Sequence, residues 1–356
     1  MSKAKGKINT KFIQEQTKRA VVDREWYSVR SLLGYNWAEF FVLLGGREAG
    51  KSYSVTKFFV HQWKTKHIPF YWIRLTEAAT RKLLSNNAEK LVDPDIARHY
   101  ELELTTKGNN VYDHGEKMAT VLALSTFYSD KGQGMFDKDF LNDPNMRYHV
   151  SLDEFQKEKT EKSQGDICYQ FVNEMENILR STKERVRIFL IGNTLEEASD
   201  ILTMFNFIPE TFGRFKLHSK RAVIDYIAPS EKYLSRRKGT IADILSPEAS
   251  TFTNKIDFDR TLLSKKRLVK PSYIIKFGRN KDTWFTVWDG KVVAPYNNEC
   301  KKDGSVVPMV AYLDHVFSTD ARDAVLATFH CRGFLFRNLI TQKKFSKQLA
   351  LLKPKG

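Results

Sequence analysis

Residues 39–56 constrain the fold of this chain more than any other stretch. They include an apolar run at 40–44, FFVLL, which is too short for a typical helix and rich in aromatic and branched residues. Such a run predicts a buried strand of a parallel sheet. The next residues, GGREAGKS at 45–52, fit the pattern G-x-x-x-x-G-K-[ST]. An amphipathic helix is expected over 51–66, and the order of strand, loop and helix predicts a phosphate-binding loop.

The residue types in this loop suit a nucleoside triphosphate. Gly45, Gly46 and Gly50 allow backbone conformations that turn N–H groups towards phosphate oxygens. The positive end of the following helix points at the same anion. Lys51 is expected to reach the β- and γ-phosphates of ATP, and the Ser52 hydroxyl to ligate Mg²⁺.

A second motif places two acids at the end of a strand. Residues 148–152, YHVSL, predict a core strand, and Asp153 and Glu154 follow it. Asp153 is expected to hold the Mg²⁺ shell through water, and Glu154 to orient and deprotonate the water that attacks the γ-phosphate. The strand at 187–193 ends in Asn193, a candidate γ-phosphate sensor. A turn-forming role for Asn193 in Gly-Asn-Thr is the alternative.

The whole chain is expected to form an α/β fold with two domains. The ATPase domain covers 1–228 with a basic extension at 1–30, a linker or irregular lid covers 229–266, and a smaller α+β domain covers 267–356. The other expected elements are strands at 69–74, 222–228, 272–277, 283–288 and 291–294, helices at 77–92, 167–182 and 320–332, a meander at 100–126, a polar loop at 129–134 and a basic tail after 332.

The formal net charge of +16 lies outside the ATPase core. Residues 1–30 carry about +5, 31–228 about −1, 229–266 about +3 and 267–356 about +9. This distribution favours a polyanion partner, and nucleic acid over membrane. The sequence has no apolar run of membrane-spanning length and no signal-peptide segment, and its three scattered cysteines fit a reducing cytoplasm.

The ordered motifs resemble those of the DNA-packaging ATPases of phi29-type bacteriophages, small relatives of the terminase large subunits. The resemblance covers most of the chain. The features that carry it are G-x-R-x-x-G-K-S-Y from Gly45 to Tyr53, the aromatic strand ending in Arg74, Ser129-Asp130-Lys131, Asp153-Glu154-Phe155 with Lys159, Leu179-Arg180 with the basic stretch 184–187, and the strand ending at Asn193.

This resemblance implies a RecA/ASCE-type P-loop ATPase core and a smaller C-terminal α+β domain resembling a degenerate RNase H-like nuclease. It implies an ATP-driven motor that translocates double-stranded DNA into a viral procapsid through a ring, usually of five subunits. The implied cofactors are ATP and Mg²⁺. The implied partners are DNA, the procapsid or portal protein and further copies of the chain, with a structural RNA left open and no membrane. We expect the protein to act in the host cytoplasm and to reside transiently at the portal vertex of the procapsid. We do not expect it in the mature virion.

The resemblance also implies roles for residues of the nucleotide site. Arg47 would add charge at the γ-phosphate, and Asp153 and Glu154 would be metal-coordinating and catalytic. The complete ATP-binding set would be Gly45, Gly46, Arg47, Glu48, Ala49, Gly50, Lys51, Ser52, Tyr53 and Asn193.

Four further residues match positions that act between subunits or on DNA. Arg180 matches the trans-acting arginine finger. The spacing between Arg180 and Arg185 is one residue longer than the family pattern, so Arg185 is the alternative finger. Lys131 and Lys159 match lysines of the intersubunit face or the DNA pore.

Other functions fit part of the sequence. The motif NKID at 254–257 matches the N-K-x-D of GTPases, but no apolar strand precedes it. A DNA-cutting packaging enzyme needs clustered carboxylates, and the acids of 267–356 form no D-x-D or D-x-E cluster, so nuclease activity is not expected. A protein that merely holds ATP has no need of Glu154 as a base. Another ASCE-class DNA motor, for segregation or recombination, remains the alternative.

Overall fold

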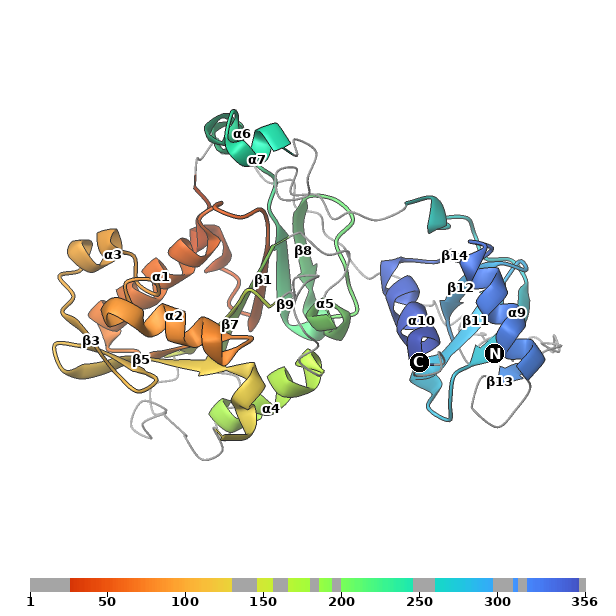
Figure 1. Cartoon of the computed structure of the whole chain (residues 1–356), viewed down its shortest axis with the longest axis horizontal. Coiled ribbons are helices and arrows are strands. Elements are labelled where there is room, and N and C mark those ends of the chain that lie inside the picture. The colour runs from red at the N-terminus through yellow and green to blue at the C-terminus, as the bar shows by residue number, and fades with distance from the viewer. Residues whose placement is uncertain are drawn as a thin grey trace, which may run out of the picture. The chain divides into compact units, whose positions relative to one another are not determined.

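The computed structural model of the chain describes residues 26–129, 146–155, 166–179, 186–193, 200–245, 260–296, 310–312 and 319–351. The chain divides into two compact units (Figure 1). The first consists of residues 1–205 and 209–257, and the second of residues 206–208 and 258–356. Each unit has its own sheet and its own apolar core.

The first unit is built on a nine-stranded sheet in the order β3-β4-β5-β2-β6-β7-β1-β9-β8. Strand β1 (Phe40–Leu44) lies between β7 (Val186–Gly192) and β9 (Ala222–Tyr226) and is parallel to both. Strand β6 (Tyr148–Asp153) lies between β7 and β2 (Phe70–Arg74), again in parallel. Parallel strands end at one edge of a sheet, so the residues that follow β1, β6 and β7 meet there.

Antiparallel strands flank this parallel core. Strand β5 (Glu116–Ala123) is parallel to β2 and antiparallel to β4 (Asn110–Asp113), which pairs with β3 (Leu104–Lys107). The expected meander at 100–126 therefore extends the main sheet. At the opposite edge, β8 (Gly213–Leu217) is antiparallel to β9. Strand β8 was not predicted from the sequence.

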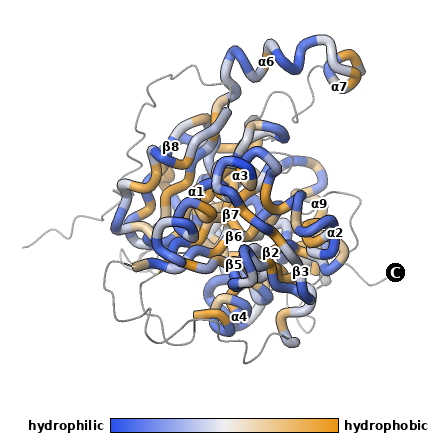
Figure 2. Tube along the Cα trace, turned by 90° about the vertical axis from the view of Figure 1, so that its left-hand side faces the viewer, coloured by the Kyte–Doolittle hydropathy of each residue, from blue (hydrophilic) through white to orange (hydrophobic). Residues whose placement is uncertain are grey.

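Aromatic side chains fill the core between the sheet and α1. Strands β1, β6 and β9 are buried along nearly their whole length, because they lie in the middle of a sheet covered by helices. Phe41 stacks on Phe189 with ring centroids 5.2 Å apart, and Phe59 packs on Phe70 at 5.1 Å. In Figure 2 the strands are largely hydrophobic in colour, whereas the outer helix α3 is mostly hydrophilic.

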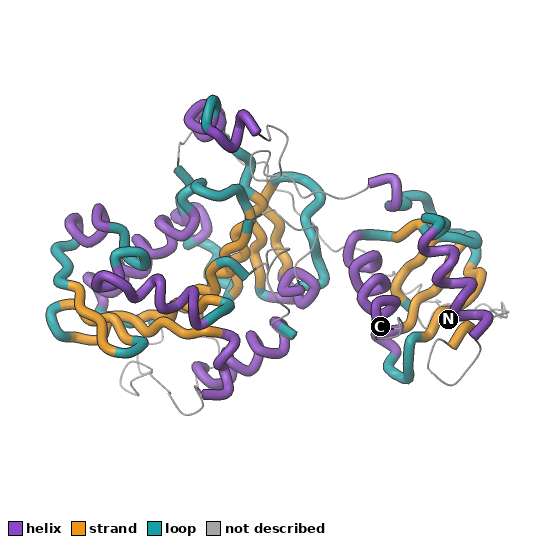
Figure 3. The backbone as a smooth tube through the Cα atoms, in the orientation of Figure 1, coloured by secondary structure: helices purple, strands orange, loops and turns teal. Residues whose placement is uncertain are grey.

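Helix α1 (Lys51–Lys66) starts directly after the phosphate loop, as expected. It ends where His67 adopts a left-handed conformation and donates its N–H to the Trp63 carbonyl at 2.8 Å. Figure 3 shows α1, α2 and α3 on one side of the sheet and α4 (Ile167–Leu179) on the other. The helix expected over 167–182 is described as far as Leu179.

The helix expected over 77–92 is shorter in the structure. Helix α2 spans Glu77–Ala88, and the Thr76 side chain caps it by accepting the Ala79 N–H at 3.2 Å. Asn86 and Asn87 adopt left-handed conformations, which asparagine tolerates better than most residues, and the regular helix breaks there. Helix α3 (Pro94–His99) follows separately, capped by Asp93.

The expected linker or irregular lid at 229–266 contains two short helices of the first unit. Helix α6 (Glu231–Arg237) begins at Ser230, whose side chain accepts the Tyr233 N–H at 3.1 Å, and helix α7 (Ile241–Leu245) follows. The prediction of irregular structure was wrong here, because the helix-capping serine is hidden in a run of charged residues. A short helix, α5 (Asp200–Met204), lies earlier in the unit.

The second unit contains a five-stranded mixed sheet in the order β13-β10-β11-β12-β14. Strands β10 (Pro271–Lys276), β11 (Trp284–Trp288) and β12 (Val292–Pro295) are successive antiparallel neighbours and match the expected strands. Strand β13 (Val310–Tyr312) is parallel to β10, and β14 (Leu335–Phe336) is parallel to β12. Neither β13 nor β14 was expected.

Two helices complete the second unit. They are α9 (Thr319–His330), close to its expected range, and α10 (Leu339–Leu351). The expectation of a basic tail was wrong, because Phe345 of α10 packs against Phe285 and Phe334 with ring centroids 5.1 and 5.5 Å apart. Within the described ranges, no helix has the length and apolar character needed to cross a membrane.

Candidate functional site

The phosphate loop leaves the end of β1 in a conformation that requires glycine at one position. The Gly45 N–H donates to the Gly192 carbonyl at 3.3 Å, which keeps the start of the loop beside β7. Gly50 has φ 86°, a left-handed conformation that side chains disfavour. A side-chain carbon at Gly50 would also lie 3.2 Å from the ring of Trp26. Conformation and space therefore both select glycine directly before Lys51.

The ammonium group of Lys51 lies inside the loop. Its Nζ donates to the carbonyl oxygens of Gly45 and Gly46, each at 2.7 Å, and to Asn193 Oδ1 at 3.4 Å. Lys51 is only 5% exposed, and this burial is the main cause that lowers its pKa to about 8. A phosphate in the loop would offer this charge a stronger partner than neutral oxygens.

Ser52 and Asp153 bring two oxygen ligands together beside the loop. The Ser52 hydroxyl donates to Asp153 Oδ1 at 3.1 Å. Burial raises the pKa of the Asp153 carboxyl, while the Arg74 guanidinium acts in the opposite direction. Hydroxyl and carboxylate oxygens are the ligands that Mg²⁺ prefers, and a cation favours the charged form of a buried carboxyl. The pair therefore fits a magnesium ion held between the protein and a phosphate.

Arg74, at the end of β2, links both acids. Its Nη1 lies 3.0 Å from Asp153 Oδ2, and its Nη2 forms an ion pair with Glu154 Oε2. Glu154 itself has φ 54° and a side chain that is 55% exposed, so its carboxylate is open to water. The sequence singled out Arg74 only as the end of a strand. Its role was missed because its partners lie 79 and 80 residues away.

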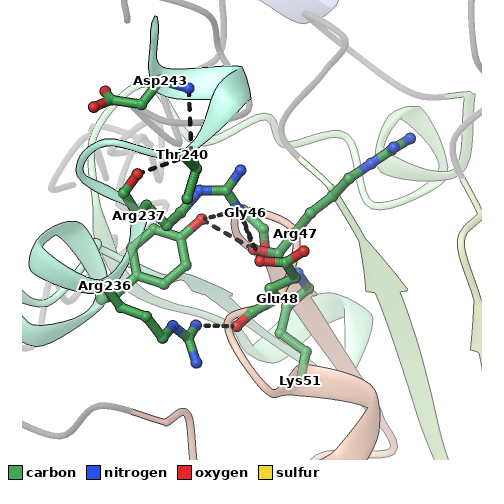
Figure 4. Close-up of polar contacts among 9 residues, drawn as sticks. Gly46, Arg47, Glu48, Lys51, Arg236, Arg237, Thr240 and Asp243 are labelled. Carbon is green, nitrogen blue, oxygen red and sulfur yellow. Dashed lines mark hydrogen bonds and ion pairs between the residues drawn. The ribbon is translucent and has the colours of Figure 1, made fainter.

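Helix α6 holds the outer side of the phosphate loop (Figure 4). The Tyr233 hydroxyl donates to the Arg47 carbonyl at 2.9 Å, and Arg236 donates to the Glu48 carbonyl at 2.8 Å. Arg237 Nη1 lies 3.3 Å from both the Arg47 carbonyl and Glu48 Oε2. These contacts were also missed. The available signal was the capped, arginine-rich stretch that follows the strand beside β1.

Three predicted nucleotide-binding residues are placed differently from Lys51 and Ser52. The Arg47 side chain extends away from α6 in Figure 4, and its backbone carbonyl makes the contacts with that helix. Tyr53 is 37% exposed, lies on the first turn of α1 and lines a cavity beside that helix. Glu48 has φ 60°, and its side chain faces Arg237.

The structure therefore brings Lys51, Ser52, Asp153, Glu154 and Asn193 together at one edge of the sheet. The predicted finger residues Arg180 and Arg185 and the predicted pore residues Lys131 and Lys159 lie outside the described residues. The motif at 254–257 also lies outside them.

A parallel sheet with a phosphate loop after β1 and paired acids at the end of β6 defines the α/β class of P-loop proteins. The family model of the podovirus DNA encapsidation protein (Gp16) matches residues 22–293 of the chain. The chain belongs to this family. It is a phage DNA-packaging ATPase whose function is ATP-driven packaging of DNA.

Solved structures share the fold across nearly the whole chain. The bacteriophage phi29 viral genome packaging motor assembly matches with a TM-score of 0.62 and 18% identity, covering 93% of this chain and 100% of the other. The Phi-28 gp11 DNA packaging motor matches with a TM-score of 0.62 and 14% identity, covering 93% and 98%. A comparison with curated protein sequences found no match.

Proposed function

We propose that this chain hydrolyses ATP at the edge formed by the ends of β1 and β6, and that this reaction moves double-stranded DNA. The observation that carries the proposal is the convergence of Lys51, Ser52, Asp153 and Glu154 at that edge. A binding loop alone would account for the lysine and the serine. It would not account for an exposed carboxylate held beside a buried one.

Each residue has a distinct task in the proposed reaction. Lys51 binds the β- and γ-phosphates. Ser52 and Asp153 would hold Mg²⁺, which would withdraw charge from those phosphates. Glu154 orients a water molecule and accepts its proton as the water oxygen bonds to the γ-phosphorus. The bond between the γ-phosphorus and its bridging oxygen breaks, which yields ADP and phosphate. Asn193 hydrogen bonds to the γ-phosphate before it leaves.

Two variants test these roles. Lys51→Ala is expected to abolish ATP binding, because it removes the buried charge of the loop. Glu154→Gln is expected to keep ATP binding and lose hydrolysis, because it retains the side-chain shape without the base. Filter binding of ATP and phosphate release, with and without DNA, measure both properties. Near-normal phosphate release by Glu154→Gln would contradict the assignment of the base.

We also propose that the active site is completed by a neighbouring subunit in a ring, with Arg180 or Arg185 as the finger. Such an arginine stabilises transition-state charge and is worth roughly 10³–10⁵ in rate. Mixing Arg180→Ala with Glu154→Gln tests this, since each inactive chain supplies what the other lacks. Activity that returns at intermediate ratios supports a finger acting in trans. No recovery in rings shown to be mixed would exclude Arg180, and the same experiment with Arg185→Ala tests the alternative.

The second unit is proposed to bind DNA without cutting it and to be a degenerate relative of RNase H-like nucleases. Its mixed sheet and the basic excess of 267–356 support this role. Asp289 accepts the backbone N–H groups of Val269 and Lys270, a structural task rather than a metal-binding one. Among the residues that the structure describes, no group of three His, Cys, Asp or Glu suits a metal ion.

The remaining proposals concern the assembly. The ring, of five subunits by resemblance, would act in the host cytoplasm at the portal vertex of the procapsid and leave before the virion matures. Lys131 and Lys159 are proposed for the subunit interface or the DNA path. Reconstitution of packaging with and without RNA tests whether a structural RNA takes part.

A further inference from the structure

Two arginines lie at the edge of the nine-stranded sheet opposite the nucleotide site. Arg147 directly precedes β6, and Arg187 is the second residue of the neighbouring strand β7. Both strands run in parallel from this edge towards the edge that holds Asp153. The stretch of strand between Arg147 and Asp153 spans about 20 Å. The arginine pair, Arg147 and Arg187, therefore has no part in the nucleotide chemistry proposed above.

The two guanidinium groups converge on the segment that precedes β1. Arg147 Nη2 donates to the Asn36 carbonyl at 2.7 Å, and Arg187 Nη2 donates to Asn36 Oδ1 at 3.2 Å. The pair also donates to two further carbonyl oxygens of residues 33–38, at 3.1 and 3.5 Å. All of these acceptors are neutral. Two positive charges are thus held close together by oxygens that carry no charge.

The charge of the arginine pair is not neutralised within the parts of the chain that the structure describes. Neither arginine contacts a carboxylate there. Glu39, which directly precedes β1, instead forms an ion pair with Arg221 at 2.9 Å. Burial, and then the charge of Arg147, lower the pKa of Arg187 to about 10, so both groups stay charged at neutral pH. Bringing like charges together is unfavourable unless an anion joins them.

Further cations lie along the same edge. The pKa of the neighbouring His149 is lowered by burial and then by the charges of the arginine pair and of Lys66, the exposed last residue of α1. Lys220 is exposed in the turn between β8 and β9, where His218 stacks on Trp37 with ring centroids 4.1 Å apart. Residues 31–228 carry only about −1 in total, so this edge is a local excess of positive charge.

We propose that the arginine pair binds the phosphate backbone of duplex DNA and gives the first unit a DNA contact of its own. Guanidinium groups bind phosphate oxygens through paired N–H donors, and these hydrogen bonds are stronger than those to neutral carbonyl oxygens. Contacts with phosphates carry no sequence information, which suits a chain that moves any DNA. The inference rests on the proposed function, which supplies the DNA, and it adds a site outside the second unit.

The salt dependence of duplex DNA binding by the full chain tests this site. Arg147→Gln with Arg187→Gln removes both charges but keeps N–H donors for the carbonyl oxygens of 33–38. If each arginine neutralises one phosphate, the slope of log affinity against log salt is expected to become shallower by about 2. The loss of affinity relative to the wild type should then be about tenfold larger at about 50 mM salt than at about 200 mM.

Three further measurements separate charge from structure. Arg147→Lys with Arg187→Lys keeps both charges and is expected to keep the wild-type slope. Arg147→Gln alone leaves Arg187 in place and is expected to make the slope shallower by about 1. Lys82→Gln with Lys90→Gln is the matched control, since both lysines are exposed on the same unit and the loss of charge is the same. This control is expected to keep the wild-type slope.

A wild-type slope in both glutamine variants of the arginine pair would overturn the inference. An equal change of slope in the lysine variant or in the control would also overturn it, because the charge of this pair would not be the cause. Duplex RNA provides a second arm, and a slope that changes with RNA alone would exclude the DNA contact. A wild-type chain that binds no duplex DNA would instead contradict the proposed function, and the inference with it.

Discussion

Arg74 and Glu154 form an ion pair across the ends of the neighbouring strands β2 and β6. The carboxylate proposed as the catalytic base is therefore held by a cation that also contacts Asp153 at 3.0 Å. Arg74 and Asp153 are both largely buried, at 15% and 6% side-chain exposure. Arg74 therefore both stabilises the buried Asp153 carboxylate and orients the proposed base, Glu154.

Replacing Arg74 with alanine is expected to lower the free energy of unfolding by about 3 kcal/mol, because Asp153 is left buried without its cation. ATP hydrolysis is expected to fall as well, since Glu154 loses its orienting partner. Chemical denaturation and phosphate release measure the two effects. The control is Arg81→Ala, which removes a surface ion pair with Glu77 and is expected to cost about 0.5 kcal/mol or less. Equal destabilisation by both variants would contradict this account.

The contacts between α6 and the phosphate loop predict that Arg237 slows the release of bound ATP. Its guanidinium lies 3.3 Å from the Arg47 carbonyl and from Glu48 Oε2, so Arg237→Ala should loosen the phosphate loop. Loss of about 1 kcal/mol of hydrogen bonding corresponds to a roughly fivefold faster release of ATP. Stopped-flow measurements with a fluorescent ATP analogue provide the rate. Lys238→Ala, an exposed cation at the end of the same helix, should release ATP at the wild-type rate.

The buried side chain of His149 leads us to expect that the free energy of unfolding depends on pH. Its imidazole is fully buried between Phe58 and Phe59, with no hydrogen-bond partner in the described part of the chain, and burial lowers its pKa to about 3. The unfolded chain protonates His149 below about pH 6.5 and the folded chain does not. Acidification from pH 6.5 towards 3 therefore favours unfolding, by up to about 1.4 kcal/mol per pH unit.

The His149→Phe variant isolates this effect, because it keeps an aromatic ring in the same place and cannot titrate. Denaturation of both proteins between pH 7 and 5 gives the difference in free energy of unfolding. The wild type is expected to lose about 1 kcal/mol more than the variant between pH 6.5 and 5.5, because His149 of the unfolded chain is already half protonated at pH 6.5. Parallel curves for the two proteins would show that the buried imidazole is not responsible.

Much of the fold and part of the site could be predicted from the sequence. Strand β1, the loop and α1 are encoded within one continuous stretch, and the acids at the end of β6 follow a short apolar run. Arg74 and α6 could not be assigned, because their contacts join residues 79 to 190 positions apart. Strand β14 and helix α10 were missed because the basic composition of this stretch conceals the apolar residues that pack into the core, among them Phe336, Phe345 and Leu349.

DNA binding is expected to be electrostatic and independent of sequence, with its main contacts in the second unit. Affinity for duplex DNA should fall steeply with salt. Arg279 and Lys281 are exposed in the turn between β10 and β11, so the double alanine variant should reduce the salt slope by about 2 if both contact phosphates. Lys82→Ala with Lys90→Ala, exposed on the first unit, is the control. If only the control pair reduced the salt slope of DNA binding, the DNA site would be assigned to the first unit instead.

ATP hydrolysis with Glu154 as the base is proposed to drive DNA into a capsid. The most direct measurement is protection of DNA from nuclease, with procapsids of the same phage, Mg²⁺ and ATP, by the wild type and by Glu154→Gln. Glu116→Gln is the control, since Glu116 is an exposed acid at the start of β5. Protected DNA is expected for the wild type and Glu116→Gln, and none for Glu154→Gln although that variant still binds ATP. Protection by Glu154→Gln equal to that of the wild type would contradict it.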